Sequence, residues 1–241
     1  MNKSMRVTSF GNCVQLTFYP GVFPVNCYLV REDDGLTLID TGLPSSAKAI
    51  LAAAQRLDMP IQRIALTHAH GDHVGALDTL REALPDAEVM ISARDARLLR
   101  GDTSIDPAEP QVGVRGSVKP CKTHPTRLLT AGDRIGSLEV ISCPGHTPGH
   151  VAFFDARDRT LIAGDAFQTK GGVAVAGTVR PLFPFPALAT WHRPTALNSA
   201  KHLRQLHPSH LAVGHGNILV DPLDAMDAAI QMAERKLKGQ M

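Results

Sequence analysis

Residues 67–73 carry the stretch that decides the fold, Thr67-His68-Ala69-His70-Gly71-Asp72-His73. His68, His70 and Asp72 are spaced by two, so on an extended loop leaving a strand their side chains point to one side. His73 follows directly, at the start of a predicted helix. Imidazoles and a carboxylate are ligand types that suit zinc and related divalent ions. The stretch therefore predicts a metal site at the carboxyl end of a strand.

Three further residues of ligand type occur later in the chain, and each comes directly after a predicted strand. They are His146, Asp165 and His215, and small residues lie close before each of them. Alone, each of the three is as readily an ordinary histidine or aspartate. Their order after the first run, and their common place at strand ends, predict that they complete the same metal site.

Hydrophobic periodicity divides the chain into short strands and amphipathic helices. Strands are predicted at residues 13–19, 25–31, 36–40, 64–67, 89–92, 138–142, 151–155, 160–163 and 211–213. Helices are predicted at residues 45–57, 74–84, 93–100, 189–206 and 223–237. Strands followed by helix–strand alternation, and then the same pattern again, predict two β-rich halves with helices outside. The expected fold is an α/β protein, a four-layer αββα sandwich.

The length and composition are those of one soluble domain spanning residues 1–241, with 44% hydrophobic and 20% charged residues. Residues 101–125 differ, because they are rich in proline, glycine and polar side chains without a clear period. We interpret them as an inserted surface loop or lid. Long loops in compact domains are often functional, although an insertion without a role fits this composition equally well.

Charge and cysteine usage limit the partners. The formal net charge is +2, with acids and bases interspersed, so no basic stripe for nucleic acid is expected. The four cysteines are far apart, which favours reduced thiols in a cytosolic protein. Residues 1–12 have no apolar core of signal-peptide length, and no apolar run reaches the roughly 18 residues of a membrane span. We expect a cytoplasmic protein with a small-molecule substrate and no membrane or nucleic-acid partner; a homodimer stays open.

With these residues in view, the sequence resembles the metallo-β-lactamase superfamily, especially its glyoxalase II and lactonase-like branches. The resemblance covers residues 28–216 and includes residues 38–42 upstream of the first histidine run. The matching ligand residues are His68, His70, Asp72, His73, His146, Asp165 and His215. The resemblance implies the metallo-β-lactamase fold, which is the four-layer sandwich expected above.

The resemblance also implies how two divalent metal ions are held. One ion is assigned to His68, His70 and His146, the other to Asp72, His73 and His215, and Asp165 bridges both. Asp40 corresponds to the structural aspartate that orients the ligand loop. We expect His150, close to His146 in sequence, to support the site or the core rather than to bind metal. Zinc is the expected metal, with iron or manganese as alternatives.

Two such ions can hold a bridging water and lower its pKa toward neutrality. The resulting hydroxide would attack the carbonyl of an ester, thioester or lactone, and Asp72 would orient it as the catalytic residue. This chemistry needs no serine or cysteine nucleophile, and none with a paired base is evident in the sequence. The prediction is therefore a zinc-dependent hydrolase of a small molecule.

Other activities within the resemblance stay open. A persulfide dioxygenase would use one iron held by the equivalents of His68, His146 and Asp165. A metal-dependent phosphodiesterase would use the full ligand set, and a non-catalytic metal-stabilised binding protein is a third alternative. Class B β-lactamases often have cysteine at the position of Asp165, and many lack an equivalent of His73. Those two residues therefore argue against antibiotic hydrolysis.

Apolar side chains between Asp165 and His215 are candidates for the substrate wall. The proposed substrate contacts are Phe167, Lys170, Phe183 and Phe185, and Leu182 and Trp191 lie in the same part of the chain. The three prolines within residues 181–186 oppose a helix there, so we predict a rigid loop over the site. An apolar lid favours an acyl or lactone substrate over a phosphate. An ordinary hydrophobic anchor remains the alternative for each of these residues.

Overall fold

Two mixed β-sheets form the centre of the molecule in the computed structural model, which describes residues 5–239. Residues 1–4 and 240–241, which belong to the expected domain, lie outside the described residues. The first sheet has seven strands in chain order: β1 (Met5–Phe10), β2 (Cys13–Phe18), β3 (Val25–Glu32), β4 (Gly35–Ile39), β5 (Ile61–Ala65), β6 (Glu88–Ser92) and β7 (Arg127–Leu129).

The second sheet has six strands in the spatial order β15-β14-β11-β10-β9-β8. Their bounds are β8 (Arg134–Ile135), β9 (Leu138–Ser142), β10 (Val151–Asp155), β11 (Thr160–Ile162), β14 (His210–Ala212) and β15 (Leu219–Val220). A separate two-stranded ribbon pairs β12 (Phe167–Gln168) with β13 (Ala174–Val175).

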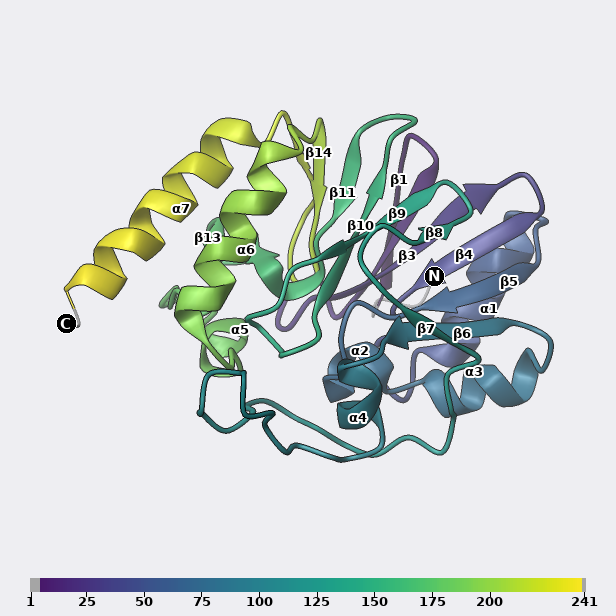
Figure 1. Ribbon diagram of the computed structural model, residues 1–241. Helices are drawn as coiled ribbons and strands as arrows, with labels where there is room; N and C mark the ends of the chain where they lie inside the picture. Colours follow the sequence, from purple (N-terminus) through teal and green to yellow (C-terminus); the bar gives the residue numbers. More distant parts are fainter. Residues whose placement is uncertain (1–4, 240–241) are drawn as a thin grey trace.

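Helices cover the outer face of each sheet (Figure 1). The helices on the first sheet's side are α1 (Ala47–Arg56), α2 (Gly71–Val74), α3 (Leu77–Ala83) and α4 (Asp95–Leu99). Those of the second half are the short helix η1 (Gly164–Ala166), α5 (Phe185–Leu188), α6 (Arg193–Gln205) and α7 (Leu223–Lys238). Among residues 5–239, no helix combines the length and the apolar character that crossing a membrane would need.

The layers follow from the two-residue period of the strands. On β10, Val151 and Phe153 belong to the apolar cluster between the two sheets, whereas Ala152 and Phe154 belong to the cluster under α6 and α7. Successive side chains of a strand point to opposite faces, so both faces of this strand are buried. Figure 1 shows α6 and α7 on one side of the strands and α1, α3 and α4 on the other. The predicted αββα sandwich is confirmed.

The strand directions bring several carboxyl ends to the same region. Strands β4, β5, β6 and β7 are parallel to one another. In the second sheet β11 is parallel to β14, and both run in the same direction as β9 because each of β9 and β11 pairs antiparallel with β10. Loops that leave these ends can therefore meet, as ligand-binding loops do in other α/β sheets.

The helix predicted at residues 74–84 is divided in two. The Gly75 N–H donates to the Gly42 carbonyl oxygen at 2.8 Å, and Val74 forms an isolated bridge with Gly42. A Cβ atom at position 75 would lie 2.7 Å from that oxygen. The chain therefore docks against the loop after β4 at this point, and a new helix begins at Leu77.

The helix predicted at residues 189–206 begins later, at Arg193. The N–H groups of Trp191 and His192 donate to the carbonyl oxygens of His146 and Gly145 at 2.9 Å, so these backbone groups serve another loop. Pro194 then lies in the first turn of α6, where its missing N–H costs no hydrogen bond. The proline-rich stretch expected as a loop contains α5, which likewise has a proline in its first turn.

Residues 101–125 run between α4 and β7 without a helix or strand of their own, and we call them the strap. In Figure 1 the strap passes beneath the sandwich from α4 toward α5 and returns to β7. One isolated bridge joins its Val118 to His70. The strap thus reaches the region of the histidine run.

Candidate metal centre

The seven predicted ligand residues come from the carboxyl ends of four strands. The first sheet provides the loop and α2 after β5, and the second sheet provides the ends of β9, β11 and β14. All of these side chains are buried except that of Asp72, which is partly buried. They are His68, His70, Asp72, His73, His146, Asp165 and His215.

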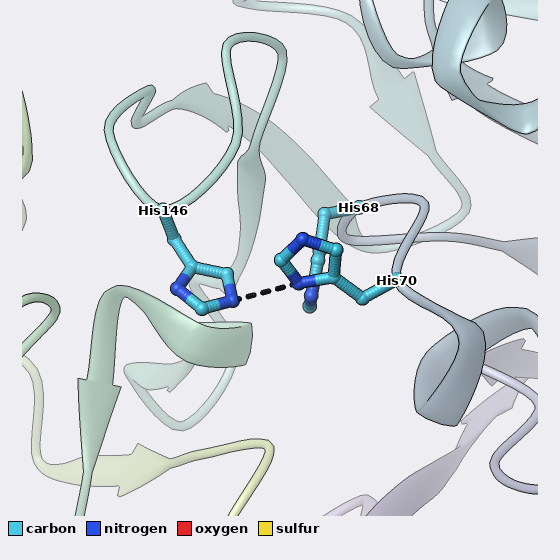
Figure 2. Close-up of side chains that lie close together, drawn as sticks. All are labelled: His68, His70 and His146. Atoms are coloured by element: carbon cyan, nitrogen blue, oxygen red, sulfur yellow. Dashed lines mark hydrogen bonds between the residues drawn. The ribbon is translucent and has the colours of Figure 1, made fainter. Parts of the chain in front are cut away.

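Their ligand atoms form three overlapping groups, each with all atoms within 4.8 Å of one another. The groups are His68–His70–His146, His68–His73–Asp165 and Asp72–His73–His215. Figure 2 shows the first group, in which His146 approaches from one loop and His68 and His70 from another. The first and third groups have the composition that the sequence resemblance implies for the two ions.

The carboxylate of Asp165 lies between these groups. Its Oδ1 atom is 3.4 Å from His73 Nε2, and its Oδ2 atom is 3.3 Å from His146 Nε2 and 3.2 Å from His215 Nε2. One oxygen therefore faces a histidine of the third group, and the other faces histidines of both groups. This is the position that a carboxylate shared by two cations would need.

The outward hydrogen bonds of His70 and His146 fix which ring nitrogen carries the proton. His70 Nε2 lies 2.8 Å from the Arg115 carbonyl oxygen, which only accepts, so Nε2 is the donor. His146 Nδ1 lies 3.2 Å from the Thr190 hydroxyl, whose own proton goes to the Pro186 carbonyl. His146 Nδ1 is therefore a donor too. In the neutral rings, His70 Nδ1 and His146 Nε2 then present lone pairs to each other across 3.0 Å.

The other three histidines also donate one hydrogen bond away from the centre, and each does so from Nδ1. His68 donates to the Thr67 hydroxyl, which in turn donates to Asp40. His73 donates to the Asp40 carboxylate at 2.8 Å, and His215 donates to a backbone carbonyl, that of Pro24, at 2.7 Å. All five rings thus direct to the centre the nitrogen that is not used in the outward hydrogen bond, which is the arrangement by which proteins orient histidine ligands.

Three of the inward atoms lack a hydrogen-bond partner in the described residues. In the described part of the chain, His68 Nε2, His73 Nε2 and Asp165 Oδ1 are buried and make no hydrogen bond. Buried polar atoms are normally satisfied, so three such atoms in one cluster require an explanation. Divalent cations bound by these lone pairs would satisfy all three. The residues present therefore fit the two metal ions.

Charge within the cluster divides it into two environments. Burial and the neighbouring imidazoles hold the pKa of His68 well below its usual value, so this ring is neutral. Burial also lowers the pKa of His215, but the carboxylates of Asp165 and Asp72 outweigh burial and raise it to about 10. A positive charge is thus strongly favoured near the two carboxylates, and a bound cation can supply it in place of a proton.

Asp40 ties His73 directly, and His68 through Thr67, to the sheet. Its carboxylate accepts hydrogen bonds at 2.8 Å from the Thr67 N–H, the Thr67 hydroxyl and His73 Nδ1. The residue has a positive φ of 60°, an unusual conformation that aims its side chain at the start of the ligand loop. The structure thus places Asp40 behind the ligand histidines, in contact with one of them.

A second buried aspartate, Asp95, was not identified from the sequence. Its carboxylate accepts hydrogen bonds from the Ala69 N–H at 3.1 Å and from the Thr147 hydroxyl and Gly149 N–H at 2.7 Å. It therefore joins the loop of His68 and His70 to the loop of His146. Burial, partly offset by these bonds, raises the pKa of Asp95 to about 6. Its position just after a strand end was the available signal.

His150 lies beside the cluster, and in the residues described it is in none of the three ligand groups. The Asp165 N–H donates to its Nε2 at 3.1 Å, and its Nδ1 lies 3.1 Å from the Cys143 sulfur. His150 thus supports the backbone of the shared carboxylate.

A pocket of about 670 Å³ opens onto the cluster and includes His70, Asp72, His146, Asp165 and His215 in its wall. Apolar side chains from the β2–β3 connection, the loop after β4 and α5 form part of the remaining wall, and the strap contributes further side chains. The apolar residues are Phe23, Leu43, Phe185 and Leu188, and the strap residues are Ser117, Lys119 and Cys121.

The structure separates the four proposed substrate contacts. Phe185 borders the pocket, and Phe183 lies behind it, with ring centroids 5.3 Å apart. Phe167 is buried in the core beneath α6 and α7, and the Lys170 ammonium donates to the Gly21 carbonyl at 2.9 Å. Among residues 5–239, neither Phe167 nor Lys170 borders this pocket. Phe23, at the tip of the β2–β3 hairpin, was not singled out from the sequence.

Comparison with known proteins agrees with this geometry. Residues 20–215 match the family model of the metallo-beta-lactamase superfamily. The uncharacterized protein YobT of Bacillus subtilis (strain 168) is 54% identical over 96% of this chain and 100% of its own length. A hydroxyacylglutathione hydrolase, or glyoxalase II, of Xanthomonas axonopodis pv. citri (strain 306) is 30% identical over 64% of this chain and 51% of its own.

A solved structure of TTHA1623 in a di-iron-bound form is similar with a TM-score of 0.63 and 33% identity, covering 84% of this chain and 92% of that one. The family match extends from the β2–β3 connection to His215, so it includes every ligand residue of the cluster. The chain therefore belongs to the metallo-β-lactamase superfamily and is related within it to glyoxalase II.

Proposed function

We propose that this protein hydrolyses an ester, thioester or lactone bond of a small molecule with two divalent metal ions. The observation that carries the proposal is the set of five histidines that are held by outward hydrogen bonds and direct their other nitrogen to a centre containing the Asp165 carboxylate. Imidazole and carboxylate ligands suit zinc, which is our proposed metal. Iron is the alternative that the di-iron relative suggests.

When bound, the ions would supply Lewis acidity, lowering the pKa of a shared water and polarising the substrate carbonyl. The chain's own residues supply the rest. Asp72 is the most exposed carboxylate of the cluster and borders the pocket, so it can orient an attacking water as well as bind metal. The neighbouring His73 and His215 overcome the effect of burial and hold the pKa of Asp72 below its usual range. Asp72 therefore stays ionised and accepts hydrogen bonds.

The wall of the pocket supports a carbonyl substrate with an apolar group. Phe23 and Phe185 stack edge-on, with ring centroids 5.2 Å apart, and both border the pocket beside His215. A ligand that covers exposed aromatic side chains removes apolar surface from water, and this favours its binding. We propose that this side of the pocket holds the acyl part of the substrate, next to the metal centre.

Metal analysis of the purified protein, combined with a substrate panel, tests the proposal. The panel contains thioesters, lactones, phosphodiesters and β-lactams. We expect close to two metal ions per chain, hydrolysis of a thioester, ester or lactone, and loss of that activity after chelation. Phosphodiester turnover without carbonyl hydrolysis would overturn the substrate class. One iron per chain with oxygen uptake on a persulfide would instead favour a dioxygenase.

Replacement of Phe185 by alanine tests the apolar wall. Its side chain is 51% exposed, so a bound acyl chain can cover much of it. We expect KM for a long-chain thioester to rise roughly tenfold, the equivalent of about 1.4 kcal/mol, while kcat and the KM of a short-chain substrate change little. Leu128→Ala is the matched control, because Leu128 on β7 is similarly exposed at 52% and does not border the pocket. Equal KM values for Phe185→Ala and the unaltered protein would contradict an acyl site here.

A further inference from the structure

His70 differs from the other four ligand histidines in the segment that accepts its outward hydrogen bond. His68, His73, His146 and His215 are held by groups outside the strap, as described above. His70 Nε2 instead donates to the carbonyl oxygen of Arg115, which belongs to the strap. The orientation of this one ring therefore depends on where the strap lies.

The strap makes this contact through a close backbone approach. Gly116 has a φ of +88°, and a Cβ atom added there would lie 2.4 Å from His70 Nε2. The Gly71 N–H donates to the Ser117 carbonyl oxygen at 2.8 Å, and Val118 forms an isolated bridge with His70. Arg115, Ser117 and Val118 thus contact the ligand loop through backbone groups, and Gly116 between them occupies a space that only glycine fits.

The strap is fixed on both sides of this contact. Before it, the Trp191 indole N–H donates to the Val112 carbonyl oxygen at 2.8 Å. After it, the Asp78 carboxylate accepts hydrogen bonds from the N–H groups of Lys122 and Thr123 at 3.0 and 2.8 Å. These anchors hold the Arg115 carbonyl in front of His70.

We propose that the strap is a positioning element for the metal centre, and that the Arg115 carbonyl and Gly116 set the geometry of His70 as a ligand. This inference rests on the proposed two-metal function. His70 belongs to the group with His68 and His146 and not to the group with Asp72 and His215. A displaced strap should therefore weaken one of the two ions selectively.

The test is Gly116→Ala, whose added methyl group pushes the His70 ring away from its acceptor. We expect affinity for one of two zinc ions to fall by about 10–100-fold, as is typical when a ligand histidine loses its supporting hydrogen bond. Dialysis against a graded series of chelator concentrations should leave about one zinc per chain at concentrations where the unaltered protein retains two. Gly113→Ala is the matched control, because Gly113 lies in the strap with no atom within 4 Å of the added Cβ.

Trp191→Phe provides a second route, since it removes the hydrogen bond to Val112 and adds no atom near His70. We expect the same selective loss of one zinc ion, with a smaller decrease in affinity than for Gly116→Ala. Thermal unfolding of the zinc-free protein checks that each variant folds. Retention of both ions by both variants, or loss of both ions in parallel, would overturn the proposal. Failure of the unaltered protein to bind two ions would instead refute the two-metal function itself.

Discussion

Replacing His70 by alanine is expected to abolish hydrolysis and to deplete metal from the protein. His70 Nδ1 faces His146 Nε2 at 3.0 Å within a three-histidine group, and alanine has no atom that can take its place. Without that ligand the group keeps only His68 and His146 beside the shared Asp165, so the ion would lose one of its three imidazole ligands. Elemental analysis and the rate on the best substrate of the panel measure the two effects.

His124→Ala is the control for this experiment. His124 is an exposed histidine of the strap, and in the part of the chain that the structure describes it belongs to none of the ligand groups. It should keep full metal content and full activity. Retained activity with full metal content in His70→Ala would refute the assignment of the centre, whatever the substrate.

Asp40→Asn is expected to have the next largest effect, on both folding and metal binding. The Asp40 carboxylate accepts three hydrogen bonds from Thr67 and His73. An asparagine has one accepting oxygen, and its NH₂ group would face at least one donor. We expect the free energy of unfolding of the metal-free protein to fall by about 1–3 kcal/mol, the cost of leaving buried polar groups unsatisfied. Zinc affinity should fall by about 10–100-fold, because His73 loses the group that orients it.

Urea unfolding followed by circular dichroism measures the first effect, and competition with a chromogenic chelator measures the second. The matched control is Asp34→Asn, which makes the same change where an aspartate pairs with Arg63 at the surface. Exposed ion pairs contribute about 0–1 kcal/mol, so that variant should remain close to the unaltered protein. If the two variants lose equal stability, Asp40 does not support the site in the way described.

Elements that hydrophobic periodicity determines could be predicted from the sequence. Breaks and short strands that depend on a hydrogen bond to a distant backbone group could not. The alternating residues of β2 and the long amphipathic α7 were expected within a few residues of their observed bounds. The break at Gly75 was not, because it depends on a hydrogen bond to Gly42, 33 residues earlier. The two-residue strands β12 and β13 were missed for a related reason: so short a segment is a strand only through its partner.

The same contrast between local sequence signals and distant contacts applies to the metal centre. The potential ligands were recognisable because metal binding requires particular side chains, and four of them lie between positions 68 and 73. Apart from Asp40, which the resemblance indicated, their supporting groups were not recognisable, since two of them, at Pro24 and Arg115, are backbone carbonyls that any residue provides. Thr190 is 44 residues from the ring it orients, and nothing in the local sequence indicates that contact.

The origin of the ligands from both sheets has a consequence for the order of folding. His68 and His70 follow a strand of the first sheet and His146 a strand of the second, so neither half of the chain holds a complete three-histidine group. A half that folds first during synthesis therefore has no finished centre with which to capture an ion or attack a substrate. For the proposed activity, both halves must therefore be in place before the centre is complete.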